Sequence, residues 1–374
     1  MKKILIIGAG FSGLSAAKAL SRQKSEVDVT IIDKKQSFDF LPVLPDCLGR
    51  RVDPGCLAYP LSEAAKKLKF TYINEEVTSV DLENRKVSTL KQELTYDYLI
   101  IASGTETNFY DNENLENNAF KVDSVQDISV LLSVLKNKNF NNYLICGGGY
   151  TGVELATNLR KFLRGNRKKD KRIILVERAP SILGPLPEWM KKYTLENLRR
   201  LNIEIFTGTS VERSELGGVA LYGGRIFENS LLIWAAGVKT ASFIQKIDAD
   251  KNPQGRLNVN SHLRLRQNCF VIGDAAYFAV KQSYLRMAVQ FSIYEGALAG
   301  ENVLRSIKGK ELKDYRPLDL GYIIPMANNR SCGLVLGMKL KGFIPTLMHF
   351  FMCIYRSYGA RNKLRLFFNF LKGL

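Results

Sequence analysis

The 374-residue chain is long enough for two or three domains of ordinary size. Its apolar content of 46% is normal for a globular protein and excludes the disordered and coiled-coil classes. The net charge of +18 is unusual and predicts attraction to an anionic partner. Nucleic acid, a dinucleotide and an acidic membrane surface are the candidates, and the positions of the basic residues must decide among them.

Cysteine spacing and hydropathy narrow the class further. No two cysteines have the C-x-x-C spacing, which argues against a zinc site and against a common dithiol redox motif. The opening MKKILIIGAG has two lysines before an apolar run, but this run is too short for a secretory signal. No uninterrupted stretch of 18 apolar residues occurs, so no membrane-spanning helix is expected. We therefore expect a protein of the cytosol or of the cytoplasmic face of a membrane.

The chain opens with the pattern strand, glycine turn, helix, strand. Residues 3–7 form an apolar run typical of a buried parallel strand. Gly8, Gly10 and Gly13 then give G-x-G-x-x-G, in which the glycines permit a tight turn, close approach of a pyrophosphate and close helix packing. The following helix would offer free N–H groups to the phosphates. Asp33 ends the returning strand and would bind a ribose hydroxyl, so a dinucleotide site is favoured over glycines required by packing alone.

A second copy of this pattern begins near the middle of the chain. Gly147, Gly149 and Gly152 repeat the fingerprint, and Glu177 stands where the ribose-binding acid is expected. A carboxylate there repels a 2′-phosphate and favours NADH over NADPH, although the neighbouring Arg178 weakens this preference. The basic insert RGNRKKDKR lies within this copy and has no interleaved aromatic residues, so it predicts a solvated loop rather than a nucleic-acid patch.

The two copies are expected to be nested. YDYLIIASGTE and LLIWAAGVK repeat a pattern of strand and small-residue turn, and NCFVIGDAA is typical of a last parallel strand ending near Asp274. The sequence therefore predicts an α/β protein with two nested Rossmann-like dinucleotide-binding domains and a small carboxy-terminal module. The expected bounds are 1–115 and 245–320 for the first nucleotide domain, 116–244 for the second, and 321–374 for the module.

Two fingerprints in one chain favour a pair of nucleotide cofactors. One site can hold a permanently bound flavin while the other admits an exchanging nicotinamide, and the chemistry then belongs to the cofactors. We interpret the first turn as the FAD site and the second as the NADH site. No nucleophile–base pair is apparent, and His262 and His349 are the only histidines, so an imidazole-dependent mechanism is not expected.

The tail is basic and amphipathic. No acidic residue follows Asp319. Apolar residues recur at helical spacing near the end of the chain: Leu364, Leu366, Phe367, Phe368, Phe370, Leu371 and Leu374. Polar residues gather on the other arc of the same helix: Arg361, Asn362, Arg365, Asn369 and Lys372. A basic amphipathic helix in the membrane plane is favoured over packing on the protein core or on a dimer partner, because apolar insertion and attraction to anionic lipid reinforce each other there.

These motifs resemble those of the type II NADH dehydrogenases, single-chain flavoproteins with two dinucleotide-binding domains. The matching phrases stand in the family's order along nearly the whole chain: GAGFSGL, VTIID, LIIASGTE, GGGYTGVELA, ILVER, IWAAGVK and VIGDAA. The resemblance implies NADH:quinone oxidoreductase activity without proton pumping, non-covalent FAD, NADH as substrate and a membrane quinone as acceptor. Residues 342–371 are similar to the family's membrane-docking region, which implies a peripheral protein held on the bilayer through 343–374. A homodimer is a further implication, and no nucleic-acid partner is expected.

The resemblance also implies site residues. Glu154, in the phrase YTGVELA, would face the region where flavin and nicotinamide stack; the alternative is a partly exposed helix carboxylate. Glu154 and Gln290 are the expected catalytic residues. The expected FAD-binding residues are Gly8, Gly10, Phe11, Ser12, Gly13, Asp33, Lys34, Val77, Ala102, Ser103, Gly104, Gly273, Asp274, Val289 and Gln290. The expected NADH-binding residues are Gly147, Gly149, Tyr150, Thr151, Gly152, Glu154, Glu177, Ala236 and Gly237.

The acceptor side departs from the family pattern. The segment AVQFSIYEG keeps Gln290 but has Tyr294 and Glu295 where a glutamine pair is expected. Ala275 stands at the usual cysteine of the G-D-C-A phrase, and the loop 38–54 is atypical. Gln290, Tyr294 and Glu295 are candidates for the quinone side, and the identity of the natural acceptor stays open.

Two rival interpretations remain. One is a sulfide:quinone oxidoreductase, which has the same fold and uses reactive cysteines near the flavin. Cys332 lies at a suitable late position in the chain, but no clear partner cysteine is apparent for it. This interpretation also gives no function to the second glycine fingerprint. The other rival is a non-catalytic, membrane-docked flavoprotein that senses the redox state of NADH. Sequence does not separate this sensor from an enzyme, because binding and turnover use the same residues.

Overall fold

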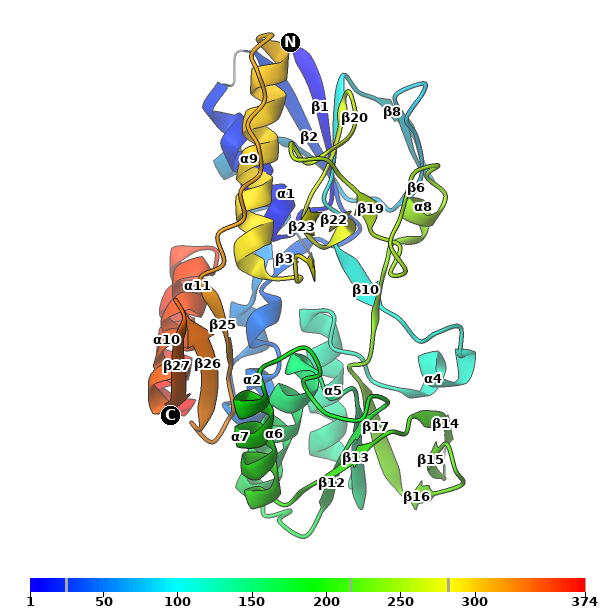
Figure 1. Cartoon of the computed structure of the whole chain (residues 1–374), viewed down its shortest axis with the longest axis vertical. Coiled ribbons are helices and arrows are strands. Elements are labelled where there is room, and N and C mark those ends of the chain that lie inside the picture. Colours follow the sequence, from blue (N-terminus) through cyan, green and yellow to red (C-terminus); the bar gives the residue numbers. More distant parts are fainter. Residues whose placement is uncertain (24–25, 216, 281–282, 374) are drawn as a thin grey trace. The chain divides into compact units, whose positions relative to one another are not determined.

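The computed structural model describes residues 1–23, 26–215, 217–280 and 283–373 and divides into two compact units. Unit 1 consists of Met1–Phe38, Tyr59–Glu106 and Val238–Asp319. Unit 2 consists of Asp39–Ala58, Thr107–Gly237 and Leu320–Leu374. The expected α/β fold with two nested Rossmann-like parts is confirmed (Figure 1). Residues 39–58 and the tail fall within unit 2, whereas the sequence placed them in the first nucleotide domain and in a separate module.

The main sheet of unit 1 has the strand order β20-β21-β9-β1-β2-β5. Its centre is parallel, because β1 pairs in register with β2 on one side and with β9 on the other. The strands are β1 (Lys2–Ile7), β2 (Val27–Ile32), β5 (Thr71–Ile73), β9 (Tyr98–Ile101), β20 (Arg264–Arg266) and β21 (Cys269–Val271). Smaller elements of the unit include α3 (Leu61–Leu68), β6 (Val77–Asp81), β7 (Lys86–Thr89), β8 (Glu93–Thr95), α8 (Ser242–Gln245) and β19 (Leu257–Asn258).

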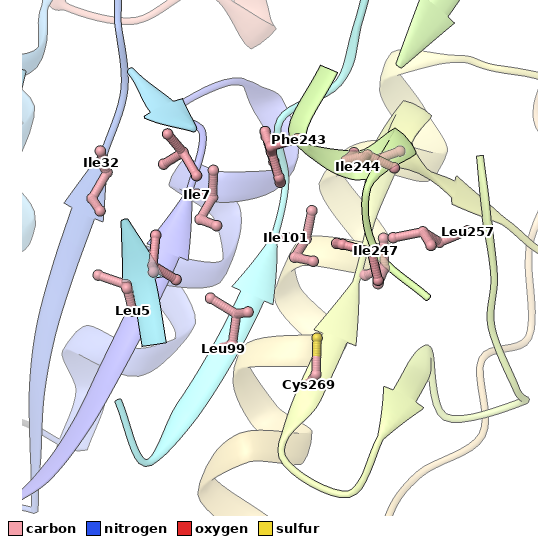
Figure 2. Packing of buried hydrophobic residues seen from close by; sticks show 14 of the residues in the cluster. Leu5, Ile7, Ile32, Leu99, Ile101, Phe243, Ile244, Ile247, Leu257 and Cys269 are labelled. Atoms are coloured by element: carbon pink, nitrogen blue, oxygen red, sulfur yellow. The ribbon is translucent and has the colours of Figure 1, made fainter. Parts of the chain in front are cut away.

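One face of this sheet carries a continuous apolar cluster (Figure 2). Leu5 and Ile7 of β1 share the face with Leu99 and Ile101 of β9, because alternate residues of a strand point to the same side. Phe243 and its neighbours in α8 pack on the same cluster. This packing fixes the carboxyl ends of β1 and β9, from which the first glycine turn and the turn after Ile101 begin.

Helix α1 (Phe11–Leu20) lies against α9 (Val289–Ile307) in unit 1 (Figure 1). The backbones approach closely because glycines stand at the crossing: a Cβ at Gly296 would lie 2.1 Å from Ser12 O, and one at Gly300 would lie 2.8 Å from Ala16 O. Ser15 Oγ adds a hydrogen bond of 2.6 Å to Ile293 O. The helix that follows the first glycine turn is therefore held rigidly by a segment almost 280 residues further along the chain.

Unit 2 contains a four-stranded parallel sheet of order β13-β12-β11-β17. Its strands are β11 (Asn142–Cys146), β12 (Arg172–Glu177), β13 (Ile203–Thr207) and β17 (Ser230–Trp234). The larger helices are α5 (Val125–Asn137), α6 (Tyr150–Gly165) and α7 (Glu188–Arg200). Shorter elements are α2 (Asp46–Gly49), α4 (Glu113–Asn118), β14 (Val211–Glu215), β15 (Gly218–Leu221) and β16 (Ile226–Glu228).

The tail forms an antiparallel meander followed by two helices (Figure 1). These elements are β25 (Gly321–Ile324), β26 (Ser331–Val335), β27 (Met338–Gly342), α10 (Phe343–Arg356) and α11 (Ala360–Gly373). The rings of Phe350 and Phe370 stack with their centroids 3.9 Å apart, which joins the two helices. Within the described residues, no helix combines the length and the hydropathy needed to cross a membrane.

Candidate dinucleotide sites

The first glycine turn leaves a gap at the start of α1. Gly8 has φ +101, and a Cβ there would lie 2.4 Å from Ala102 O. A Cβ at Gly13 would lie 1.9 Å from Gly8 O, so no side chain fits at either position. By contrast, a Cβ at Gly10 would have no described heavy atom of its surroundings within 4 Å. Gly8 and Gly13 are thus required by the protein itself, whereas the space over Gly10 is open to a ligand.

Asp33 closes this turn with its carboxylate. Oδ2 accepts a hydrogen bond of 2.7 Å from Ala9 N, and Oδ1 accepts one of 2.8 Å from Lys35 N. Burial raises the pKa of Asp33 and these two hydrogen bonds oppose that rise. A carboxylate has about four acceptor positions, so capacity for a ribose hydroxyl remains.

The second turn has the same backbone geometry as the first and is closed by the same kind of hydrogen bonds. Gly147 has φ +112, and a Cβ at Gly152 would lie 1.8 Å from Gly147 O, while a Cβ at Gly149 would again have no described heavy atom of its surroundings within 4 Å. Glu177 Oε2 accepts a hydrogen bond of 2.7 Å from Gly148 N, and Oε1 accepts one of 2.7 Å from Ala179 N. The longer basic insert before β12 therefore does not alter the geometry of the turn.

The residues of the first turn fit a dinucleotide with a pyrophosphate. Helix α1 begins after Gly10 with no side-chain cap, so its first N–H groups point at the open space. Ser103 Oγ is buried, and no hydrogen-bond partner for it exists among the described residues. Ser103 lies beside the turn, since a Cβ at Gly8 would be 2.9 Å from its Cα. An unpaired buried hydroxyl next to a helix N-terminus without a side-chain cap is the arrangement expected where a ligand completes the hydrogen bonding.

Gly273 and Asp274 follow β21 in the same unit. Gly273 has φ +66 and contacts α1, because a Cβ there would lie 2.6 Å from Ser12 Oγ. Its N–H donates a hydrogen bond of 2.6 Å to Glu295 Oε2. Burial raises the pKa of Asp274. Burial also raises the pKa of Glu295 to about 7, although the hydrogen bond from Gly273 lowers it. Glu295, expected on the acceptor side, is thus buried inside unit 1 and holds this turn.

The other two acceptor-side candidates lie near the start of α9. Gln290 Nε2 donates a hydrogen bond of 3.1 Å to Asp319 Oδ1, and Arg286 Nη2 lies 2.7 Å from the same oxygen. Tyr294 is exposed, with its ring centroid 5.5 Å from that of Tyr315. Tyr315 was not singled out from the sequence, because only the tertiary fold brings it to α9.

Glu154 lies half-buried on α6 beside a group of charged residues. Burial raises its pKa to about 8, His349 lowers it and Asp46 raises it. Asp46 is buried and pairs with Arg50 at 3.0 Å, and His349 Nε2 lies 3.9 Å from Asp46 Oδ2. Asp46 and His349 were missed from the sequence, since one belongs to a four-residue helix in an atypical loop and the other to the tail.

The residues expected to bind FAD and those expected to bind NADH lie in different units. All the FAD candidates belong to unit 1, including Val77, Lys34 and the segment 102–104, and all the NADH candidates belong to unit 2. Lys34 forms ion pairs with Glu76 at 3.0 Å and Glu106 at 3.7 Å. The assignment of individual residues to each cofactor remains a prediction.

The cysteines lack the features of a redox centre. All six are free and buried: Cys47, Cys56, Cys146, Cys269, Cys332 and Cys353. Cys332, the candidate for sulfide chemistry, lies 3.7 Å from Thr194 Oγ1, and burial raises its pKa to about 11. A thiol of this kind is a poor nucleophile near neutral pH.

The fold and the paired turns define a class of flavin- and nicotinamide-binding oxidoreductases. The family model described as pyridine nucleotide-disulphide oxidoreductase matches residues 2–296, and the chain belongs to this family. Within it, the chain is similar to the Type II NADH:quinone oxidoreductases of Staphylococcus haemolyticus and Staphylococcus aureus, each 25% identical over 369 residues and 91% of both chains. The expected resemblance to type II NADH dehydrogenases is confirmed.

Solved structures show the same fold. NDH2 from Plasmodium falciparum in complex with NADH matches with a TM-score of 0.87 at 18% identity, over 99% of this chain and 98% of that chain. The sulfide:quinone oxidoreductase from Aquifex aeolicus matches with a TM-score of 0.80 at 16% identity, over 95% of this chain and 90% of that chain. At these identities the likeness concerns the fold alone, so the site must decide the activity.

Proposed function

We propose that this chain is an FAD-dependent NADH:quinone oxidoreductase that does not pump protons. The observation that carries this proposal is the repeated glycine turn, closed by Asp33 in unit 1 and by Glu177 in unit 2. Two such turns provide one site for a resident flavin and one for an exchanging nicotinamide. The relatives named Type II NADH:quinone oxidoreductase, similar over 91% of their length, support NADH as donor and quinone as acceptor.

In this proposal the protein binds and orients the two nucleotides. A bound FAD supplies the acceptance of hydride and the onward transfer of electrons. The first N–H groups of α1 and α6 bind the pyrophosphates, and Asp33 and Glu177 bind the adenosine riboses. Glu154, whose burial raises its pKa to about 8, is placed to hold a proton at neutral pH. Gln290 and Tyr294 are proposed on the quinone side, with Glu295 fixing the turn behind them.

The two tail helices support docking to a membrane surface. Exposed large apolar side chains line α10 at intervals of about one turn: Phe343, Ile344, Leu347, Phe351 and Tyr355. On α11 the exposed apolar residues are Leu364, Phe367, Phe368 and Leu371. Leu366 and Phe370, assigned to the same face from the sequence, are instead buried in unit 2. Leu374 lies outside the described residues.

Three polar side chains of helix α11 face the protein, on the same side as the buried Leu366 and Phe370. Asn362 Nδ2 donates to Ala58 O at 2.8 Å, Arg365 pairs with Asp53, and Asn369 lies 3.9 Å from Cys56 Sγ. A surface helix of a soluble protein covers most of its large apolar side chains, whereas α11 leaves four of them exposed. We propose that the exposed apolar side chains of α10 and α11 insert into a lipid bilayer. The basic residues of the tail favour an anionic leaflet on the cytoplasmic face. A homodimer formed through the tail remains part of the proposal.

Steady-state oxidation of NADH with a soluble quinone tests the activity. We expect many turnovers per flavin and no requirement for sulfide. A redox sensor would reduce its flavin once and stop, and a sulfide:quinone oxidoreductase would reduce quinone with sulfide but not with NADH. Either of these two results would overturn the proposed function.

A further inference from the structure

We propose that Tyr110, with Arg178, forms the surface on which the adenine of NADH stacks in unit 2. This inference rests on the proposed function and deepens it, because neither side chain belongs to the dinucleotide fingerprint. The adenine ring is planar and stacks on aromatic and guanidinium faces, so a tyrosine and an arginine beside the ribose-binding acid suit it chemically.

Tyr110 lies against the turn that ends β17. Gly237 has φ +77, and a Cβ at this position would lie 2.2 Å from Tyr110 Oη and 2.7 Å from its Cζ. The tyrosine ring therefore occupies the space beside Gly237, one of the residues expected to bind NADH. Tyr110 is nevertheless 55% exposed, so much of its side chain is accessible to a ligand.

Arg178 links Tyr110 to the ribose-binding carboxylate. Its guanidinium carbon lies 6.0 Å from the centroid of the Tyr110 ring, within the range of a cation–π contact. The preceding residue, Glu177, holds Gly148 and Ala179 through its two oxygens. Glu177 ends β12, and Gly237 follows β17 of the same parallel sheet, at the carboxyl edge where α/β folds bind nucleotides. Tyr110 meets this edge at Gly237, and Arg178 meets it directly after Glu177.

The loop that carries Tyr110 is built to hold it in place. Asn108 accepts a hydrogen bond of 2.8 Å from Tyr110 N through its side chain, and its own carbonyl accepts one of 3.0 Å from Trp234 Nε1. Phe109 anchors the loop in the core, with its ring centroid 5.5 Å from that of Trp234. The exposed ring is therefore presented from a fixed backbone.

The backbone of this loop is strained. Tyr110 has φ +55 and Asp111 has φ +58, and in the part of the chain that the structure describes no other two adjacent non-glycine residues share the left-handed conformation. Glycine would adopt this conformation without the steric cost that tyrosine carries. Residues held in a costly backbone conformation are frequent at binding sites, which agrees with a role of the Tyr110 side chain in binding.

Steady-state kinetics with two alternative hydride donors, NADH and reduced nicotinamide mononucleotide, test this inference, because the mononucleotide lacks the adenosine half. Tyr110→Gly relieves the strain and removes the ring, so its thermal unfolding should not fall below that of wild type. Its KM for NADH should rise about tenfold, its kcat should change little, and its kcat/KM for the mononucleotide should stay within about twofold. Tyr110→Phe should recover most of the NADH affinity, and Tyr222→Ala, which removes another exposed tyrosine of unit 2, should behave as wild type.

The outcomes separate this inference from the proposed function. If wild type turns over NADH but Tyr110→Gly has an unchanged KM, the stacking role is overturned while the function stands. Equal losses with both donors would place Tyr110 in a general structural role and would also overturn the inference. If wild type does not oxidise NADH at all, the proposed function itself fails.

Discussion

The carboxylate of Glu177 accepts a hydrogen bond of 2.7 Å from the backbone N–H of Gly148. Asp33 has the same relationship to Ala9 in unit 1, also at 2.7 Å. In each unit the acidic residue at the end of the second strand therefore fixes the glycine turn of the first strand. The acid therefore shapes the turn even before a nucleotide binds, and in the proposed function the same side chain also binds the ribose.

Replacing Glu177 should affect the nicotinamide site alone. In Glu177→Ala the ribose loses a charged acceptor, so we expect the KM for NADH to rise about tenfold or more. The flavin content, measured from the visible absorbance per mole of protein, should stay at the wild-type value. Asp33→Ala is the matched control and should lose flavin instead. Loss of flavin from Glu177→Ala would mean that the two cofactors are assigned to the wrong units.

The two kinds of glycine in the first turn should respond differently to alanine. Gly10 has φ −75, which alanine tolerates, and its Cβ would enter open space, so apo Gly10→Ala should unfold at the wild-type temperature. Its affinity for FAD should fall at least tenfold, because the methyl group occupies the path of the pyrophosphate. FAD titration of the apoprotein measures this effect.

Gly13→Ala provides the contrast. Its Cβ would lie 1.9 Å from Gly8 O, so the apoprotein itself should lose about 1–3 kcal/mol or more of its free energy of unfolding. Denaturant unfolding of the two apo variants checks the difference. Equal stability of the two would contradict the roles given to these glycines.

The exposed apolar face of α10 and α11 should control membrane binding. Phe351→Ser and Leu371→Ser each remove an exposed apolar side chain that would gain about 1 kcal/mol on partial insertion. The double variant should therefore bind anionic vesicles roughly 30-fold more weakly in a sedimentation assay, while its reduction of ferricyanide by NADH is unchanged. Leu90→Ser, at an exposed leucine of unit 1, is the control. Unchanged vesicle binding of the double variant would contradict docking through these helices.

Much of this architecture could be predicted from the sequence because its signals are local. The glycine fingerprints, the buried strand at 3–7 and the acids at the strand ends each occupy a few consecutive residues. The bond from Gly273 to Glu295 and the pairing of Asp46 with His349 could not be predicted, since they join distant segments. Leu366 and Phe370 are apolar like their exposed neighbours, and only the tertiary packing, such as the stacking of Phe370 on Phe350, distinguishes the buried residues from the exposed ones.

Glu154 should make the stability of the protein depend on pH. Burial raises its pKa from 4.5 to about 8 in the folded state, so the folded chain binds more protons than the unfolded chain between these values. Its contribution to the free energy of unfolding is present below pH 4.5 and is lost as the pH rises towards 8, by at most about 1.4 kcal/mol per pH unit.

Glu154→Gln removes this titration while keeping the size of the side chain. The free energy of unfolding of the variant relative to wild type should therefore increase from pH 5 to pH 8, as measured by denaturant unfolding. Parallel profiles for the two proteins would contradict the raised pKa.

An anaerobic titration of the purified protein with NADH, followed by visible absorbance, tests most directly whether the chain passes hydride from NADH to a bound flavin. We expect a yellow protein with about one flavin per chain, whose absorbance is bleached by one equivalent of NADH. A protein that neither contains nor takes up flavin, or a bound flavin that NADH leaves oxidised, would contradict this expectation.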